Sequence, residues 1–193
     1  MIAWFVANKL SLNVIKTETM IFTRKNVHFP LPPILINQKP ISYQYSIKFL
    51  GLTIDFELNW KDQIRKVQSK LSSACGILYT IRNKISTPIS RLICLSIALP
   101  YINYCNVAWS SACPSHFQSL ITTQKKLIRI MLRKNRTTPS TPLFARLKLL
   151  KYNDICQLNS ILYVFKSINN FIPSPVAFES RAQGPYNSRN QEP

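Results

Sequence analysis

Acidic side chains are scarce in this sequence of 193 residues, because seven Asp and Glu stand against 25 Lys and Arg and leave a formal net charge of +18. No acidic residue lies between Asp62 and Asp154, whereas 15 Lys and Arg do. Ion pairs within the chain cannot neutralise this stretch, and ordinary protein surfaces mix both signs. The imbalance predicts a polyanionic partner, with a solvated basic surface of no special purpose as the alternative.

Cysteine and histidine are also few. The cysteines form no C-x-x-C pair, and His28 and His116 do not complete a zinc-ligand spacing, so we predict neither a disulfide scaffold nor a metal site nor a cofactor for this chain. An odd number of cysteines favours a reducing intracellular compartment, either cytoplasm or nucleus. We expect all five to be small buried hydrophobes. They are Cys75, Cys94, Cys105, Cys113 and Cys156.

No segment reads as a membrane span or a signal peptide. Residues 92–109 carry no charge, but Pro100, Asn103 and Asn106 make this stretch a poor span and a good buried helical hairpin. The N-terminal sequence MIAWFVANKL lacks both a basic leader and a clean cleavage site. We therefore expect no targeting signal and no membrane partner.

Residues 1–57 favour short strands. β-branched and aromatic runs at 19–23, 34–37, 41–45 and 47–55 predict a small antiparallel sheet, with a turn at 38–40 and Gly51 in the middle of the last run. Only the first dozen residues, up to about 10–13, read as the tail of a helix.

Residues 58–172 change to a helical period, which completes an α+β fold with a helical bundle. Apolar residues from Trp60 to Ile85 recur at spacings of three and four and predict a helix of about seven turns. Proline or cap signals predict further helix starts at Thr87, Pro114, Thr141 and Asn153, with an interruption at Pro100. Residues 173–193 are rich in Pro, Ser, Asn and Gln and read as a mobile tail.

Basic residues follow one side of the helix after Pro114. At 100° per residue, Lys125, Lys126, Arg129 and Arg133 share a face opposite Leu120, Leu127 and other apolar residues. This pattern predicts contact with nucleic-acid phosphates, although any amphipathic helix exposes some charge. Basic residues of the long helix are expected to extend the same surface. They are Lys61, Arg65, Lys66 and Lys84.

Two N-terminal segments and several later ones are recognisable in order. The first contains WF (4–5), NKLSLN (8–13), KT (16–17) and MIF (20–22), and the second contains IKFLGLTID (47–55) and LNWK (58–61). They resemble the fourth palm motif and the primer-grip motif of reverse transcriptases from jockey-type non-LTR retrotransposons. Later matches to the region downstream of the polymerase core are PYINYCN (100–106), QKKLIRI (124–130), TPLF (141–144) and YNSRN (186–190).

The resemblance implies a C-terminal part of such an enzyme, from the end of the palm through the thumb. In that family two magnesium ions are held by an aspartate of the first palm motif and by a Tyr/Phe-Ala-Asp-Asp pair, and this sequence has no such pair. We therefore expect no catalytic residue and no magnesium site here, although the intact parent enzyme would use magnesium. Asp55 is interpreted as structural.

Further roles are implied by the resemblance alone. Lys48, Phe49, Leu50 and Gly51 match the primer grip, with a glycine bulge in a plain hairpin as the alternative for Gly51. Lys16 matches a lysine near the nucleotide phosphates, with a surface lysine as the alternative.

Two functions follow. The first is a fragment of an RNA-directed DNA polymerase that retains parts gripping primer, RNA, DNA or an RNA·DNA duplex. The alternative is a stand-alone basic nucleic-acid-binding module without chemistry. A peripheral membrane binder is disfavoured, because the apolar stripes are expected to be used in bundle packing. The sequence predicts no oligomeric state.

Overall fold

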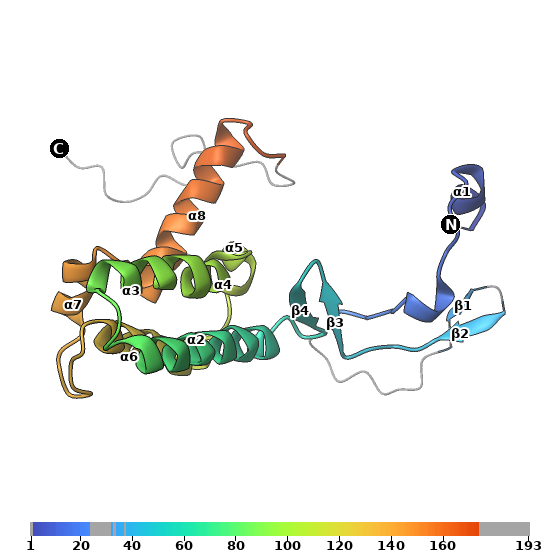
Figure 1. Cartoon of the computed structure of the whole chain (residues 1–193). Coiled ribbons are helices and arrows are strands. Elements are labelled where there is room, and N and C mark those ends of the chain that lie inside the picture. Colours follow the sequence, from blue (N-terminus) through green and yellow to red (C-terminus); the bar gives the residue numbers. More distant parts are fainter. Residues whose placement is uncertain (1, 24–31, 33, 37, 174–193) are drawn as a thin grey trace, which may run out of the picture.

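The computed structural model describes residues 2–23, 32, 34–36 and 38–173, and consists of short N-terminal elements followed by a helical body (Figure 1). The predicted α+β class is confirmed. Among the described residues every strand precedes residue 56, and every helix except two short N-terminal ones follows it. The expected tail lies, apart from Pro173, outside the described residues, as does the YNSRN motif.

Two separate hairpins form in place of one sheet. After α1 (Ile2–Ala7) and a 3₁₀ turn, η1 (Val14–Lys16), strand β1 (Ile34–Ile36) pairs antiparallel with β2 (Lys39–Ile41). Strand β3 (Ser46–Phe49) pairs antiparallel with β4 (Leu52–Asp55), with Ser46 opposite Asp55. The expected small antiparallel sheet is thus present as two separate two-stranded sheets.

The predicted strand at 19–23 does not form. Thr19 makes an isolated parallel bridge to Tyr43, and the Thr23 amide donates to the Phe56 carbonyl at 3.1 Å. β-Branched residues favour a strand only where a partner strand is available to bond along its length. The expected turn at 38–40 is also displaced, because Pro40 lies in β2, where a two-stranded hairpin tolerates a residue without an N–H.

Helix α2 (Lys61–Ile81) begins where the second hairpin ends. The Asp55 carboxylate, only 8% exposed, accepts hydrogen bonds from the amides of Asn59 and Trp60 at 2.9 and 2.8 Å, which supports its structural interpretation. The predicted apolar stripe is buried, including Ile64 and Leu71. The helix ends at Ile81, one turn before the expected Ile85.

The next helical run contains an irregularity that proline explains. It comprises α3 (Thr87–Ile93), the π-helical η2 (Cys94–Ala98) and α4 (Leu99–Asn103), followed by α5 (Asn106–Trp109). Pro100 has no N–H to donate to the preceding turn, and the wider π turn just before it accommodates that loss. The predicted interruption at Pro100 therefore appears as a change of winding, and the chain reverses at Cys105, whose φ is 48°.

The remaining helices begin close to their predicted starts. They are η3 (Pro114–Phe117), α6 (Gln118–Met131), α7 (Thr141–Leu147) and α8 (Tyr152–Ile168). Proline at the first helical positions supplies a suitable φ where no amide partner is needed. This local rule explains the starts at Pro114 and Pro142, whereas α8 begins without a proline and the Asp154 carboxylate accepts from the Lys151 amide at 3.3 Å.

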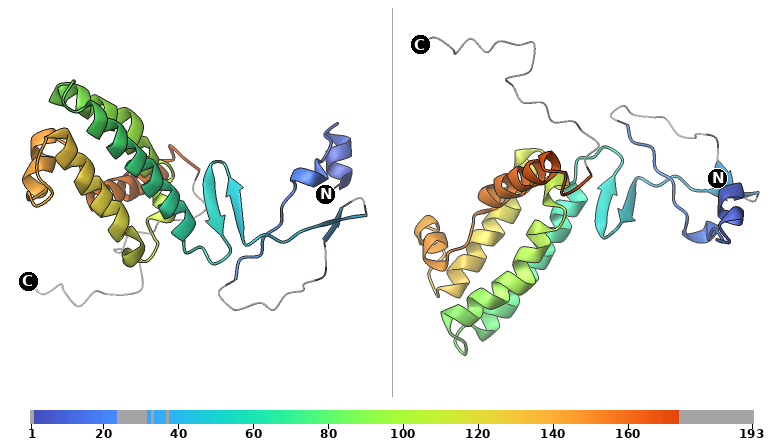
Figure 2. Two further views of the ribbon diagram at one scale, coloured as in Figure 1. Left: turned by 60° about the horizontal axis from the view of Figure 1, so that its bottom comes forward. Right: turned by 90° about the horizontal axis from the view of Figure 1, so that it is seen from above.

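Helices α2 and α6 pack side by side and run in the same direction (Figure 2). Gln68 bonds Ser119 near their N-terminal parts, and Arg133 bonds the Arg82 carbonyl beyond their C-terminal ends. The segment from α3 to α5 returns the chain between them. Residues from α2, α6 and the neighbouring helices form the core, with Trp109 fully buried.

The cysteines correct one prediction. Cys75 and Cys94 are buried, and burial raises the pKa of each thiol to about 11. Cys105 and Cys113 are exposed, because they lie in the turns on either side of α5, where no neighbouring element covers them. No helix among the described residues is long and apolar enough to cross a bilayer.

Candidate nucleic-acid interface

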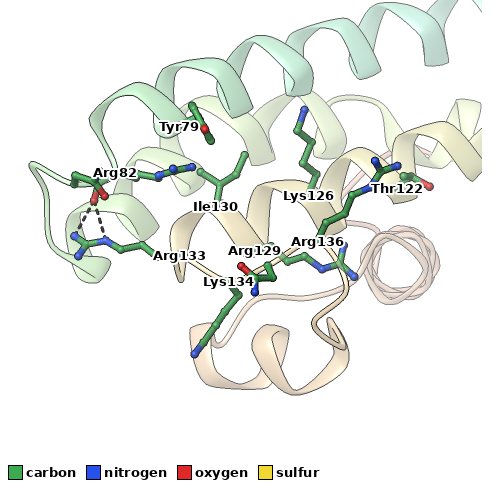
Figure 3. A pocket seen from close by; sticks show the side chains of 11 residues that line it. Tyr79, Arg82, Thr122, Lys126, Arg129, Ile130, Arg133, Lys134 and Arg136 are labelled. Atoms are coloured by element: carbon green, nitrogen blue, oxygen red, sulfur yellow. Dashed lines mark hydrogen bonds between the residues drawn. The ribbon is translucent and has the colours of Figure 1, made fainter.

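A hollow of about 650 Å³ opens beside the C-terminal halves of α2 and α6 (Figure 3). We name it the basic hollow. Six of its eleven lining residues are cationic and none is acidic. The lining residues are Tyr79, Arg82, Asn83, Thr122, Lys126, Arg129, Ile130, Arg133, Lys134, Asn135 and Arg136.

Two of these cations are internal donors. The Arg133 guanidinium donates to the Arg82 carbonyl at 2.8 and 3.1 Å and to the Ile85 carbonyl at 3.1 Å. It thereby pairs the carbonyl at the C-terminal end of α2, which a helix leaves unpaired, and one carbonyl of the loop that follows. Arg129 is half-buried, and its Nε donates at 2.9 Å to the Thr138 carbonyl, which fastens the loop after α6. Both arginines of the predicted phosphate-contacting face thus also bond carbonyls of the fold, and their contact with nucleic acid stays a prediction.

The other cations of the hollow are differently placed. Within the described part of the chain, no side-chain hydrogen bond or ion pair engages Lys126, Lys134 or Arg136, and all three are exposed. Figure 3 shows Lys134 extending away from α6. The Arg82 guanidinium lies over the Tyr79 ring, 3.7 Å from its centre. Lys126, Lys134 and Arg136 can turn toward an anion without breaking a side-chain hydrogen bond of the fold, whereas Arg82 would leave the Tyr79 ring.

The structure divides the rest of the predicted basic surface. Lys125 lies on another side of α6, where it lines a smaller hollow of about 200 Å³ with Thr141 and Lys151. Arg65 pairs with Asp62 at 2.8 Å on the surface. Neither Lys61 nor Lys84 lines the basic hollow, although Arg82 and Asn83, next to Lys84 in the sequence, do.

A second hollow, of about 370 Å³, lies where the β3–β4 hairpin meets α2 and α4. We name it the hairpin hollow. Its basic residues are Lys48, Lys66 and Lys70, and the rings of Tyr101 and Tyr104 line it. Lys66 is the only one of the eight predicted phosphate-contacting residues that lines it.

The hairpin turn is fastened to the helices by its carbonyls. Lys66 Nζ donates to the Gly51 carbonyl at 2.9 Å, and the Tyr104 hydroxyl donates to the Leu50 carbonyl. Gln63 accepts from the Thr53 amide at 3.0 Å. At Gly51 φ is +86°, and an added Cβ would lie 3.7 Å from the Tyr104 ring, so backbone conformation rather than space requires glycine.

The residues that match the primer grip are placed unevenly. Lys48 and Gly51 line the hairpin hollow, whereas Phe49 and Leu50 are exposed beside it. Lys16 ends η1 among the N-terminal elements and lines neither hollow (Figure 1). The structure therefore brings Lys48 and Lys66 together but does not bring Lys16 to them.

Sequence reasoning missed several lining residues. Lys134 and Arg136 are evident as basic residues in the sequence, but they lie in the loop after α6. Helical periodicity does not predict which way a loop side chain points. Tyr101 and Tyr104 stand in the recognised PYINYCN segment, yet nothing in that segment points to the hairpin turn 50 residues earlier. A pairing over that separation along the chain has no local signal.

Comparison with known proteins gives one clear relationship. Over 163 residues the chain is 25% identical to the probable RNA-directed DNA polymerase from transposon X-element of Drosophila melanogaster. The chain is thus similar to part of a transposon reverse transcriptase. The match covers 83% of this chain but 18% of the polymerase, so the chain spans about a fifth of that relative's length. No family model matches, and neither does any solved structure.

Proposed function

We propose that the chain is the C-terminal part of a reverse transcriptase from a jockey-type non-LTR retrotransposon. Residues 1–57 would be the end of the palm with the primer-grip hairpin, residues 58–172 the thumb and downstream helices, and 173–193 a tail. Support comes from the recognised segments and from the similarity to the X-element polymerase along most of the chain.

The part that the chain plays is to hold the phosphate backbone of RNA, DNA or an RNA·DNA duplex at the basic hollow. One observation carries this: six cations surround about 650 Å³ without an acidic neighbour in the lining. Lys and Arg that neutralise phosphates release condensed counterions, which supplies affinity without reading sequence. Arg129 and Arg133 fix the wall, and Lys126, Lys134 and Arg136 reach the phosphates.

The hairpin would present primer-grip residues next to the helical body. The bonds from Lys66 and Tyr104 to its turn support this role, since they fix the turn against α2 and α4. The proposed proximity of Lys16 to nucleotide phosphates stays a prediction.

Polymerisation is not proposed for this chain. A two-metal site needs clustered carboxylates that hold ions about 4 Å apart. Among the described residues no group of three His, Cys, Asp or Glu is placed to hold a metal ion, which supports the proposal that this chain alone holds no magnesium. Purified chain with template, primer, deoxynucleotides and magnesium should give no extended primer on a sequencing gel.

The binding test uses a fluorescent RNA·DNA duplex and measures affinity at several salt concentrations. Replacing Lys126, Lys134 and Arg136 together by glutamine should reduce the slope of log K against log salt by about three, since each lost phosphate contact removes roughly one. Folding should be unchanged, because none of the three supports a helix. A matched variant with Lys9, Lys39 and Lys166 replaced by glutamine loses the same charge elsewhere and should keep most of the slope. Equal slopes in the two variants would refute the assignment to the basic hollow.

A further inference from the structure

The hairpin hollow brings aromatic rings and cations together in one small space. Its lining includes the rings of Tyr101 and Tyr104, three lysines and no acidic residue, and Val67 and Pro100 add apolar surface. Its volume of about 370 Å³ falls at the lower end of the range of about 300–1,000 Å³ that small-molecule sites occupy. The hollow therefore has room for one planar group with an attached anion, but not for a duplex.

The two tyrosines offer ring surface that the fold leaves open. Tyr101 and Tyr104 are 41% and 49% exposed. The Tyr104 ring is held in place, because its hydroxyl donates to the Leu50 carbonyl. Within the described part of the chain the Tyr101 hydroxyl makes no hydrogen bond, so its ring is free to meet a ligand. Every nucleobase has a π face that stacks on such a ring, whatever the sequence.

The lysines of the hollow divide into one fixed cation and two available ones. Lys66 Nζ donates to the Gly51 carbonyl at 2.9 Å. Among the residues that the structure describes, neither Lys48 nor Lys70 makes a side-chain hydrogen bond or an ion pair, and both are exposed. Lys70 Nζ lies 5.9 Å from the centre of the Tyr101 ring, within the range of a cation–π contact. A cation thus stands where it can reach the phosphate of a base stacked on that ring.

This combination of groups discriminates among ligands. An apolar peptide would use the rings but leave the lysines without a partner, and a lipid headgroup would use the lysines but offer the rings nothing flat. The bases of a duplex are stacked on each other and cannot reach a tyrosine. An unpaired nucleotide carries both a π face and a phosphate, and single strands are recognised by this pairing of aromatic platform and basic groove.

We propose that the hairpin hollow binds one unpaired nucleotide of a single strand, with its base on the Tyr101 ring beside Tyr104 and its phosphate on Lys48 and Lys70. The inference rests on the proposed function, since it takes nucleic acid as the partner, and it adds a second kind of contact. The basic hollow holds phosphates through charge alone, whereas the hairpin hollow recognises a base that has no pairing partner. The substrate class is therefore nucleic acid with a single-stranded segment.

The test compares two short single-stranded DNAs of equal length, one with bases and one with abasic sites throughout, so that both carry the same phosphates. Fluorescence anisotropy measures the affinity of each for the full chain at several salt concentrations. The strand with bases should bind about tenfold tighter or more, because one stacked base contributes a factor of that size. The salt slopes of the two strands should be equal, since stacking releases no counterions.

Substitutions at Tyr101 separate stacking from charge. Tyr101→Leu should remove the advantage of the strand with bases and leave the salt slope unchanged, because no phosphate contact is lost. Tyr101→Phe keeps the ring and should bind like the unaltered chain. The matched control is Phe165→Leu, which removes a ring that is 55% exposed on α8 and lines neither hollow, and it should also bind like the unaltered chain.

Three results would overturn the proposal. One is equal affinity of the unaltered chain for the strand with bases and the abasic strand. Another is equal affinity of Tyr101→Leu and the unaltered chain for the strand with bases, while circular dichroism shows both folded. The third is a peptide of alternating glutamate and phenylalanine that binds as tightly as this strand and loses the same factor in Tyr101→Leu, which would assign the hollow to an acidic protein segment.

The two proposals can fail separately. A blunt duplex should bind Tyr101→Leu and the unaltered chain equally, because its bases are paired. The triple glutamine variant of the basic hollow should keep the preference for the strand with bases while its salt slope falls. Loss of that preference together with the slope would show that the hairpin hollow holds no base of its own.

Discussion

The basic hollow and the hairpin hollow are both lined by cations, yet they use them differently. In the hairpin hollow Lys66 donates to the Gly51 carbonyl. In the basic hollow Arg129 donates to a carbonyl of the loop that follows α6, and Arg133 donates to the Arg82 carbonyl at the end of α2. Lys126, Lys134 and Arg136 line the basic hollow without such a bond. A basic residue can thus stabilise the fold or remain available to a ligand. Which role it has depends on whether a backbone carbonyl lies within hydrogen-bonding distance of its side chain.

The largest difference between two parts of the molecule is expected in the reactivity of buried and exposed cysteines. Burial raises the pKa of Cys75 and Cys94 to about 11, whereas a hydrogen bond with Ser115 lowers the pKa of exposed Cys113. At pH 8 a thiol reagent should modify Cys113 about 100-fold faster or more than either buried cysteine, because the thiolate reacts. Peptide mass spectrometry over time measures this.

The same raised values predict a pH effect. A thiol with a higher pKa in the folded chain than in the unfolded chain contributes stability that is present below about pH 9 and is lost as pH rises toward 11. Labelling of Cys75 and Cys94 should accelerate in that window. If they react as fast as Cys113 at pH 8, the packing of α2 and η2 into the core described above is wrong.

A smaller effect should separate Arg133 from its neighbour Lys134. Arg133→Gln removes three hydrogen bonds to the carbonyls of Arg82 and Ile85, and we expect a loss of about 1–2 kcal/mol of unfolding free energy, moderated because the arginine is exposed. Lys134→Gln should change it by less than about 0.5 kcal/mol. Urea unfolding followed by circular dichroism measures the unfolding free energy of both variants. Equal losses would show that Arg133 stabilises the fold no more than Lys134 does.

The smallest effect concerns the hairpin turn. Lys66→Met and Tyr104→Phe should each cost about 0.5–1 kcal/mol, since each removes one bond to adjacent carbonyls. Because both bonds hold one turn, the loss of unfolding free energy in the double variant should differ from the sum of the two single losses. Faster amide exchange in β4 is the local readout, and Lys70→Met is the matched control. Additive losses with unchanged exchange would show that the turn is not held by this pair.

Features that depend on local sequence were predicted correctly, whereas contacts between residues far apart in the chain were not predicted. Pro114 and Pro142 mark helix starts by their own geometry, and the stripe of α2 predicts its buried face with no knowledge of what covers it. Arg133 could not be interpreted in the same way, because its acceptors stand 51 and 48 residues earlier. The run at 19–23 has strand propensity but no strand beside it. The exposure of Cys113 could not be predicted either, because it depends on which turns are covered by other elements of the fold.

The parallel packing of α2 and α6 has an electrostatic consequence. Each α-helix carries the equivalent of about −0.5 charge at its C-terminal end, and both ends lie beside the basic hollow because Ile81 and Met131 finish the two helices at the same side of the body. The six lining cations are thus attracted first by the helices themselves. A phosphate entering the hollow meets roughly one unit less positive charge than the side chains suggest, so the folded body presents a milder field than its composition implies.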